Sequence, residues 1–101
     1  MNTYPRKPAV VILSADDRAR ALAISRALMA AFAEFKKGIQ QTNRLVTTMQ
    51  HILLEQHLSI DYVAAVDAMT LKPVEKVEAA TVLAIAARVG KTRLIDNVVL
   101  G

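Results

Sequence analysis

The chain has 101 residues, of which 53% are hydrophobic and 22% charged, a composition typical of one folded globular domain and not of a disordered segment. It contains no cysteine, which excludes disulfides, thiolate metal sites and thiol chemistry and favours a reducing, cytoplasmic setting. Thirteen Lys and Arg against nine Asp and Glu give a net charge of +4 without a dense basic run, so nucleic acid is not expected as a partner.

No stretch is expected to cross a membrane or to be removed as a leader, because apolar runs such as "AATVLAIAA" fall far short of the roughly 20 residues that a bilayer requires. Residues 1–11, with Pro5 and Pro8, sustain neither a helical period nor strand alternation and are predicted to form an extended N-terminal arm. Ser14 then offers a side-chain oxygen to the free N–H groups of a starting helix, and Asp17 can complete a weak capping box.

Two amphipathic helices are predicted next. The first runs from Ala15 to about Lys37, and Gly38 can adopt the left-handed conformation that ends a helix. Its buried stripe has spacings of three and four: Ala21, Ile24, Leu28, Phe32 and Phe35. The second runs from Thr42 to about Gln56, and its apolar face comprises Leu45, Val46, Met49, Ile52 and Leu53.

Three strands are predicted to follow. In "IDYVAAVD", residues 60–67, the alternation predicts two opposite faces: Ile60, Tyr62, Ala64 and Val66 on one, and Asp61, Val63, Ala65 and Asp67 on the other. "TVLAIAARV" is apolar throughout, as in a covered strand, although its length also allows a short buried helix. Gly90 and Lys91 fit a two-residue hairpin loop leading to "TRLIDNVVL", which favours the strand. The predicted fold class is therefore α+β: two helices packed on a small three-stranded, mostly antiparallel sheet.

The triplet Gly90–Lys91–Thr92 looks like the end of a phosphate-binding loop, yet a hairpin turn is the better interpretation. A loop of the GxxxxGK[ST] type needs an upstream glycine, where this chain has Ile85, and it must open a helix, whereas a strand is expected here. Arg88, Lys91 and Arg93 nevertheless cluster around the turn and could meet a phosphate.

The histidines and two later carboxylates do not suggest a metal or catalytic site. His51 and His57 lie six positions apart on one helix and face different directions, so they are expected at the surface or at a helix end. Asp61 and Asp67 are separated by roughly 20 Å along their strand, which excludes a catalytic carboxylate pair and favours roles at the strand ends and the turn.

The remaining polar candidates also have structural explanations. Asp16 and Asp17 lie where the helix dipole favours negative charge, so capping accounts for them without a metal ion. Ser14, Ser25 and Ser59 have no base within predictable reach, so the sequence does not support nucleophilic catalysis.

The run from Ile60 to Leu100 closely resembles the C-terminal domain of pantothenate synthetase, also called pantoate-beta-alanine ligase. The ordered pattern "DYV..VD..TL.PV" followed by "A.RVGKTRLIDN" occurs at the family's spacing, and "ILSADDRARALAISRAL" is similar to the start of the same domain. The likeness runs from about Ile12 to Leu100, so residues 12–101 are interpreted as this domain.

The resemblance implies one part of a two-part enzyme. In the family, an N-terminal nucleotide-binding fold, similar to that of class I aminoacyl-tRNA synthetases, joins pantoate to ATP with magnesium as a pantoyl adenylate, which beta-alanine attacks to give pantothenate. The C-terminal domain acts as a lid over that site. This chain is too short to include the nucleotide-binding fold, and it has "RKPAVVILS" where the family carries "MSSRN", so no ATP contact is carried over.

The chain is therefore predicted to be a free-standing or excised lid domain, inactive alone, with the N-terminal nucleotide-binding domain as its partner. ATP and magnesium are expected as cofactors of the complete enzyme and not as tight ligands of this domain, and Lys91 and Arg93 are assigned to a closed-state phosphate. Two other hypotheses stay open. One is an interaction or oligomerisation module, a homo-oligomer pairing through the edge strand "TRLIDNVVL", and the other is a small basic phosphate or nucleic-acid binder.

Overall fold

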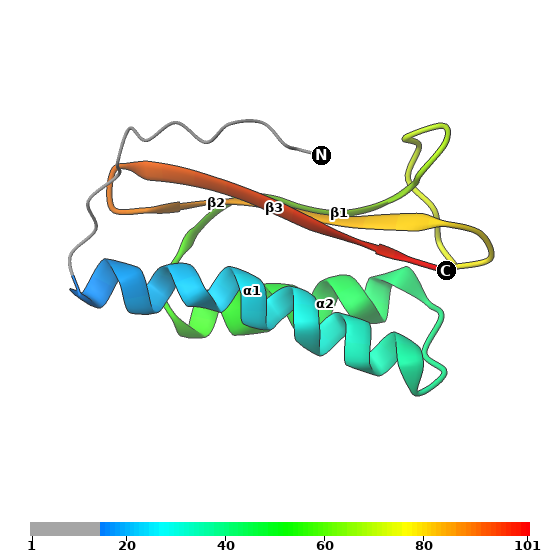
Figure 1. The fold of residues 1–101 in the computed structure, drawn as a ribbon, viewed down its shortest axis with the longest axis horizontal. Coiled ribbons are helices and arrows are strands. Elements are labelled where there is room, and N and C mark those ends of the chain that lie inside the picture. The colour runs from blue at the N-terminus through cyan, green and yellow to red at the C-terminus, as the bar shows by residue number, and fades with distance from the viewer. Residues whose placement is uncertain (1–14) are drawn as a thin grey trace.

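The computed structural model describes residues 15–101, which form two helices followed by a three-stranded sheet (Figure 1). The elements are α1 (Ala15–Lys36), α2 (Thr42–Glu55), β1 (Ser59–Asp67), β2 (Thr81–Val89) and β3 (Thr92–Leu100). The α+β arrangement predicted from the sequence is confirmed. Neither of the two helices is long and apolar enough to cross a membrane. The arm predicted for residues 1–11 and the cap predicted at Ser14 lie outside the described residues.

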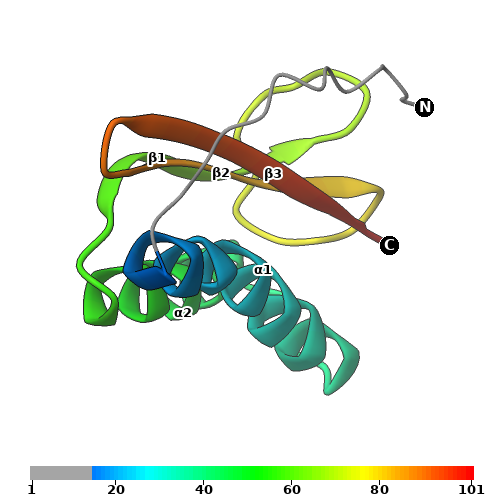
Figure 2. The same cartoon turned by 60° about the vertical axis from the view of Figure 1, so that its left-hand side comes forward.

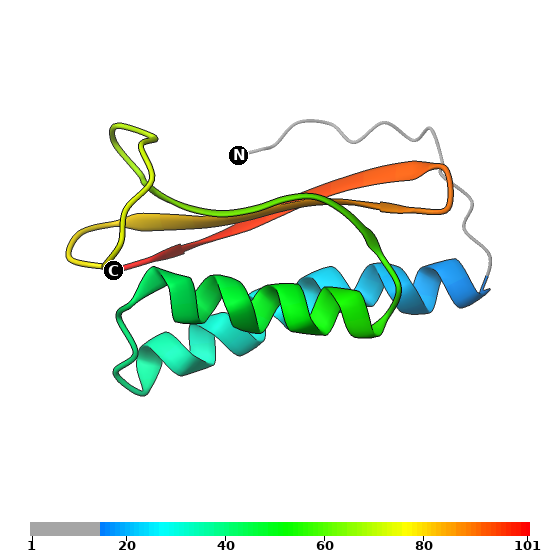
Figure 3. The same cartoon turned by 180° about the vertical axis from the view of Figure 1, so that it is seen from behind.

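The fold has two layers, a sheet and a pair of helices. The sheet is antiparallel throughout, with strand order β1-β2-β3, and both helices lie on the same face of it (Figures 1 and 3). Part of the connection between β1 and β2 rises on the side away from the helices before the chain returns to begin β2 (Figure 2). Within residues 15–101, no helix covers the second face of the sheet.

The core lies between the central strand β2 and the two helices. Along β2 the side chains that face the helices, among them Leu83, Ile85 and Val89, are almost completely buried. α2 contributes Leu45, Met49 and Leu53, all fully buried, and α1 contributes Ile24 and Leu28 at 4% exposure. The helical spacings and the strand alternation read from the sequence thus meet in one apolar layer, and its burial is the main source of stability.

Both helices end with a left-handed residue, Gly38 after α1 with φ 109° and His57 after α2 with φ 60°. After α2, the N–H of His57 donates to the carbonyl of Leu54 at 3.0 Å and the N–H of Leu58 donates to that of Leu53 at 3.2 Å. This is the Schellman arrangement, which satisfies the last carbonyls of a helix. The prediction of a cap at Gly38 is confirmed, and His57 is the helix-end residue that the sequence suggested.

β1 departs from the predicted alternation at Asp61. Its pairing with β2 shifts between Ile60 and Tyr62, so Asp61 is the extra residue of a β-bulge. The bulge turns Ile60 toward the helices, where it packs against the same core as Val63 and Ala65. The prediction that placed Ile60 on the face of Tyr62 was therefore wrong, because one inserted residue reverses the alternation.

The connection between β1 and β2 is anchored to the turn between the helices. The N–H of Thr42 donates to the carbonyl of Glu75 at 3.0 Å, and the N–H of Val77 donates to that of Gln40 at 2.9 Å. The hydroxyl of Thr42, a residue only 5% exposed, donates to the carbonyl of Val74 at 2.6 Å. These bonds satisfy backbone groups that would otherwise be orphaned at the start of α2 and in the connection.

Candidate functional site at the hairpin end of the sheet

The Gly-Lys-Thr triplet lies in a tight β-hairpin, as predicted. β2 ends at Val89 and β3 begins at Thr92, so Gly90 and Lys91 form a two-residue loop. Gly90 has φ 61°, a left-handed conformation that glycine adopts without a steric cost and that two-residue hairpins require. Because the triplet leads into a strand and not into a helix, it lacks the helix N-terminus on which a phosphate-binding loop of this type depends.

The first turn of α1 lies against this hairpin. A β-carbon built on Gly90 would lie 2.9 Å from Oδ2 of Asp17, so no side chain fits there without movement. Asp16 and Asp17 both occupy the first turn, where the positive end of the helix dipole favours carboxylates, and Asp17 also accepts a hydrogen bond from Arg20. Position 90 therefore requires glycine for two reasons: the turn needs a left-handed backbone there, and Asp17 leaves no room for a side chain.

Asp61 joins two arginines of the hairpin on the face of the sheet away from the helices. Its Oδ2 accepts a 2.7 Å hydrogen bond from Nε of Arg93, and its Oδ1 lies 3.6 Å from Nε of Arg88. Arg88 and Arg93 are directly opposite each other in the β2–β3 ladder, where like charges repel. The carboxylate between them offsets that repulsion. The hydrogen bond from Arg93, with the attraction of Arg88, lowers the pKa of Asp61 below its usual value.

The cluster confirms one prediction and corrects another. Arg88, Lys91 and Arg93 do gather at the hairpin, where Lys91 is exposed in the loop and two arginines outweigh one carboxylate. Asp61 was expected to share a face with Asp67 and to serve a strand end, but the bulge turns its carboxylate toward the arginines. Nothing in the local sequence around Asp61 marks a bulge, so only the three-dimensional pairing could have identified it.

Asp67 serves the turn after β1, as predicted. Its Oδ1 accepts hydrogen bonds from the N–H groups of Met69 and Thr70, each at 2.8 Å. The bond from Thr70 and then the bond from Met69 stabilise the charged form and lower the pKa of this carboxyl. The side chain of Asp67 therefore serves the turn, and its hydrogen bonds are local.

The other candidates of the sequence are not brought together. Nε2 of the exposed His51 lies 3.3 Å from Oε2 of Glu55 one turn on, while His57 ends the helix. Ser25 and Ser59 are exposed on different elements. Within residues 15–101 no three His, Cys, Asp or Glu side chains are grouped so that they could hold a metal ion.

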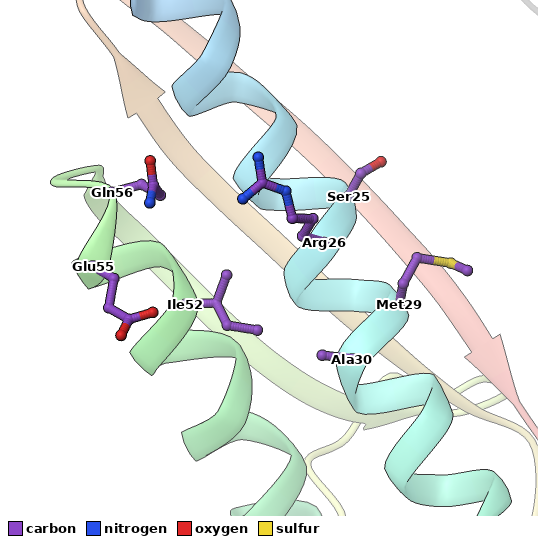
Figure 4. A pocket seen from close by; sticks show the side chains of 7 residues that line it. All are labelled: Ser25, Arg26, Met29, Ala30, Ile52, Glu55 and Gln56. Carbon is purple, nitrogen blue, oxygen red and sulfur yellow. The ribbon is translucent and has the colours of Figure 1, made fainter.

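A groove of about 410 Å³ lies between α1 and α2 (Figure 4). It is lined by Ser25, Arg26, Met29, Ala30, Ile52, Glu55 and Gln56. Ala30 of α1 and Ile52 of α2 point toward each other, whereas Ser25 and Met29 point away from α2. The lining contains no histidine, and Ser25 points away from α2, which carries Glu55, so the groove does not bring a serine and a base together.

Comparison with known proteins identifies a family. The sequence model of pantoate-beta-alanine ligase matches residues 10–99. The pantothenate synthetase of Pseudothermotoga lettingae is 44% identical over 92 residues, which cover 90% of this chain and 33% of that protein. The bifunctional pantoate ligase/cytidylate kinase of Thermosynechococcus vestitus is 44% identical over 89 residues, which cover 87% of this chain and 17% of that protein.

The fold is similar to that of a solved structure with the same family name. The crystal structure of pantothenate synthetase from Thermus thermophilus superposes with a TM-score of 0.78 at 29% sequence identity. The superposition covers 85% of this chain and 31% of that one. The chain thus spans about a third of the length of the pantothenate synthetases that it matches.

Proposed function

The chain belongs to the pantoate-beta-alanine ligase family, and we propose that it is the C-terminal lid domain of a pantothenate synthetase. In this role it closes over the ATP and pantoyl-adenylate site of an N-terminal nucleotide-binding domain during the ATP-dependent condensation of pantoate with beta-alanine. The observation that carries the proposal is the extent of the match. The family match takes in nearly all of this chain, residues 10–99, but the chain covers only about a third of the length of its relatives. A share of that size supports the interpretation of this chain as one domain of the enzyme.

Closing a lid of this kind serves two purposes. An acyl adenylate is readily hydrolysed, so excluding water from it protects the intermediate until the amine of beta-alanine attacks. Ordering the reactants under a cover also raises their effective concentration. The compact two-layer fold of residues 15–101, with one face of its sheet buried under helices, suits a body that moves as a unit.

ATP and magnesium are assigned to the partner domain. The hairpin of β2 and β3 lacks the upstream glycine and the helix of a phosphate-binding loop, and within residues 15–101 no three His, Cys, Asp or Glu side chains are grouped so that they could hold a metal ion. By themselves, the described residues do not fit ATP or magnesium. We therefore expect the isolated chain to be inactive and to bind ATP weakly.

Lys91 and Arg93 are our candidates for contacting a phosphate in the closed state. Lys91 is exposed in the hairpin loop, where its ammonium can reach outward. Arg93 has its Nε held by Asp61, which orients a guanidinium that carries further donors on its terminal nitrogens. The net positive charge of the surrounding cluster favours an anion.

Complementation tests the proposal. The chain is mixed with the N-terminal part of the P. lettingae enzyme, ending where the match to this chain begins, and pantothenate formation is assayed from pantoate, beta-alanine and ATP. Turnover by the mixture that neither part gives alone supports the lid role. Product from the chain alone contradicts it, as does an inactive mixture together with an inactive covalent fusion of the two parts.

The alternative of an oligomerisation module that pairs through β3 is less well supported. Along β3, Leu94 and Val98 face the core, and the alternation places Asp96 between them on the same side of the strand. Asp96 is nevertheless exposed at the edge of the sheet. A charge on the inward side of an edge strand discourages pairing with a second strand, because pairing would bury it without a partner.

A further inference from the structure

The face of the sheet away from the helices carries two rows of apolar side chains. The ladder places Tyr62, Ala86 and Ile95 side by side in one row. It places Val66, Val82 and Val99 side by side in the second. We call these six residues the outer sheet face.

Much of this surface is exposed to solvent. Tyr62 is 41% exposed, Ile95 57% and Val99 54%. Between the larger side chains, Ala86 is fully buried although it is not part of the core under the helices. Between the two rows the ladder places Ala64, Ala84 and the exposed Asn97, so the apolar surface is continuous across β1 and β2 and is interrupted on β3 by one amide. A grouped apolar surface of this kind marks an interaction site more often than scattered side chains do.

A polar cluster borders the outer sheet face at its hairpin end. Asp61, Arg88 and Arg93 lie on the same side of the sheet, held together by the 2.7 Å and 3.6 Å contacts of the carboxylate. At the opposite end, the connection between β1 and β2 rises on this side (Figures 1 and 2). An apolar centre with Tyr, bordered by arginine, is the usual anatomy of a specific protein interface.

The length of the relatives and the position of α1 indicate what occupies this surface. About two-thirds of the relatives' length lies outside the match. α1 begins beside the hairpin, because Asp17 in its first turn lies against Gly90. A domain that precedes α1 in the same polypeptide is therefore connected close to the hairpin end of the outer sheet face, where the polar cluster lies. The net positive charge of the cluster there favours carboxylates on the docking partner.

We propose that the outer sheet face docks the nucleotide-binding part of the enzyme, with an apolar patch of that partner on the two rows and a carboxylate opposite Arg88. This inference rests on the proposed function and adds to it the surface through which the lid closes. The exposed helical side chains, such as Leu22 at 56% exposure, then lie on the outside of the closed enzyme.

The test uses a chimera in which this chain replaces the matching third of the P. lettingae enzyme. Ile95→Glu and Leu22→Glu are a matched pair, because both residues are large and apolar with 57% and 56% exposure, and they lie on opposite layers. Thermal unfolding of both isolated variants first establishes that each is folded. We expect Ile95→Glu to lower kcat/KM of the chimera at least about tenfold and Leu22→Glu to leave it within about twofold.

Hydroxyl-radical footprinting measures whether the outer sheet face is covered, independently of catalytic activity. In the folded chimera, Tyr62 on the outer sheet face is expected to be oxidised more slowly than in the isolated chain, while Met29 on α1, 64% exposed, keeps its rate. Equal oxidation of Tyr62 in both contradicts the docking surface. Protection of Tyr62 that grows with the concentration of the isolated chain would assign the face to a second copy and overturn the proposal.

The two proposals fail in different ways. An inactive chimera with Tyr62 protected contradicts the catalytic role and supports the docking surface. An active chimera in which Ile95→Glu has no effect, or in which Leu22→Glu is the damaging change, supports the lid role and overturns the docking surface.

Discussion

Oδ2 of Asp61 accepts a 2.7 Å hydrogen bond from Nε of Arg93, although their strands, β1 and β3, are separated by β2. The bond is made because the bulge at Asp61 brings the carboxylate to the arginine side of the sheet. It ties all three strands together at the hairpin end through Arg88 of the middle strand. The conformation of the hairpin and that of β1 are therefore coupled by side chains as well as by the backbone ladder.

The first prediction concerns the pKa of Asp61. Removing the hydrogen bond with Arg93→Gln is expected to raise this pKa toward the ordinary value, and Arg88→Gln is expected to raise it less, because Arg88 lies farther away and its contribution is smaller. A carbon-detected NMR titration of the Asp61 carboxyl in the three proteins measures both shifts. An unchanged pKa in Arg93→Gln would contradict the contact.

The same contact makes stability depend on pH. Because the folded-state pKa of Asp61 is lowered, its contribution is fully present above the unfolded value of about 3.9 and is lost as the pH falls through the folded-state pKa. Asp61→Asn should therefore unfold at a lower temperature than the parent at pH 7. The difference should shrink below about pH 4, as measured by circular dichroism melts across the pH range. A difference independent of pH would point to a cause other than charge.

A side chain at Gly90 should destabilise the hairpin. Gly90→Ala places a β-carbon 2.9 Å from Oδ2 of Asp17 and puts alanine at φ 61°, so we expect a loss of about 1–3 kcal/mol in the free energy of unfolding. Lys91→Ala, in the same loop, should change it by less than about 0.5 kcal/mol. Chemical denaturation measures both. In the double variant with Asp17→Ala, the loss from Gly90→Ala should be smaller but not abolished, because the backbone strain remains.

Replacing His57, whose backbone is in the left-handed conformation, should stabilise the protein. His57→Gly removes the cost of φ 60° for a residue with a β-carbon while keeping the backbone bonds that end α2, and we expect a gain of about 0.5–1 kcal/mol. Gly38→Ala at the end of α1 is the reverse change. No atom lies within 4 Å of its added β-carbon, so its expected loss of about 1 kcal/mol is conformational only. Destabilisation by His57→Gly would show that the imidazole makes a contribution of its own.

The hydroxyl of Thr42 should hold the β1–β2 connection to α2. Thr42→Val keeps the shape of this buried side chain but leaves the carbonyl of Val74 without its 2.6 Å partner, so we expect a loss of about 1–3 kcal/mol. Amide hydrogen exchange should increase in residues 73–77 more than in β2. Thr47→Val, on the exposed side of the same helix, is the control and should change stability by less than about 0.5 kcal/mol.

The assignment of Lys91 to a phosphate makes a kinetic prediction. In the active chimera, Lys91→Gln should lower kcat/KM for ATP about fivefold, as expected for loss of about 1 kcal/mol of charge interaction. Its kcat/KM for beta-alanine should fall less. Added salt should weaken ATP use by the parent more than by the variant, because only the parent has a charge there to screen. Identical ATP kinetics and salt dependence in the two would remove Lys91 from the site.

Much of the fold follows from local patterns. The stripe from Ile24 to Leu28, the glycine after α1 and the two-residue loop at Gly90 each depend on neighbouring residues, since helices, caps and tight turns are set by backbone hydrogen bonds and by periodic burial. For the same reason, the order of residues in "RVGKTRLIDN" was enough to prefer a hairpin over a phosphate-binding loop. The family resemblance likewise depends on the linear sequence.

The relationships that define the candidate site depend on residues far apart in the chain. The bulge at Asp61 arises because Ile60 and Val63 both pack toward the helices, which strict alternation does not allow. The residue types between them do not predict a bulge. The contact of Asp17 with Gly90 and the bond of Asp61 to Arg93 arise only when α1, β1 and β3 meet. The sequence by itself thus determined the elements and the family, because short-range periodicity encodes them. The tertiary structure alone decided which charges meet and which sheet face is left open, because these depend on how the core packs.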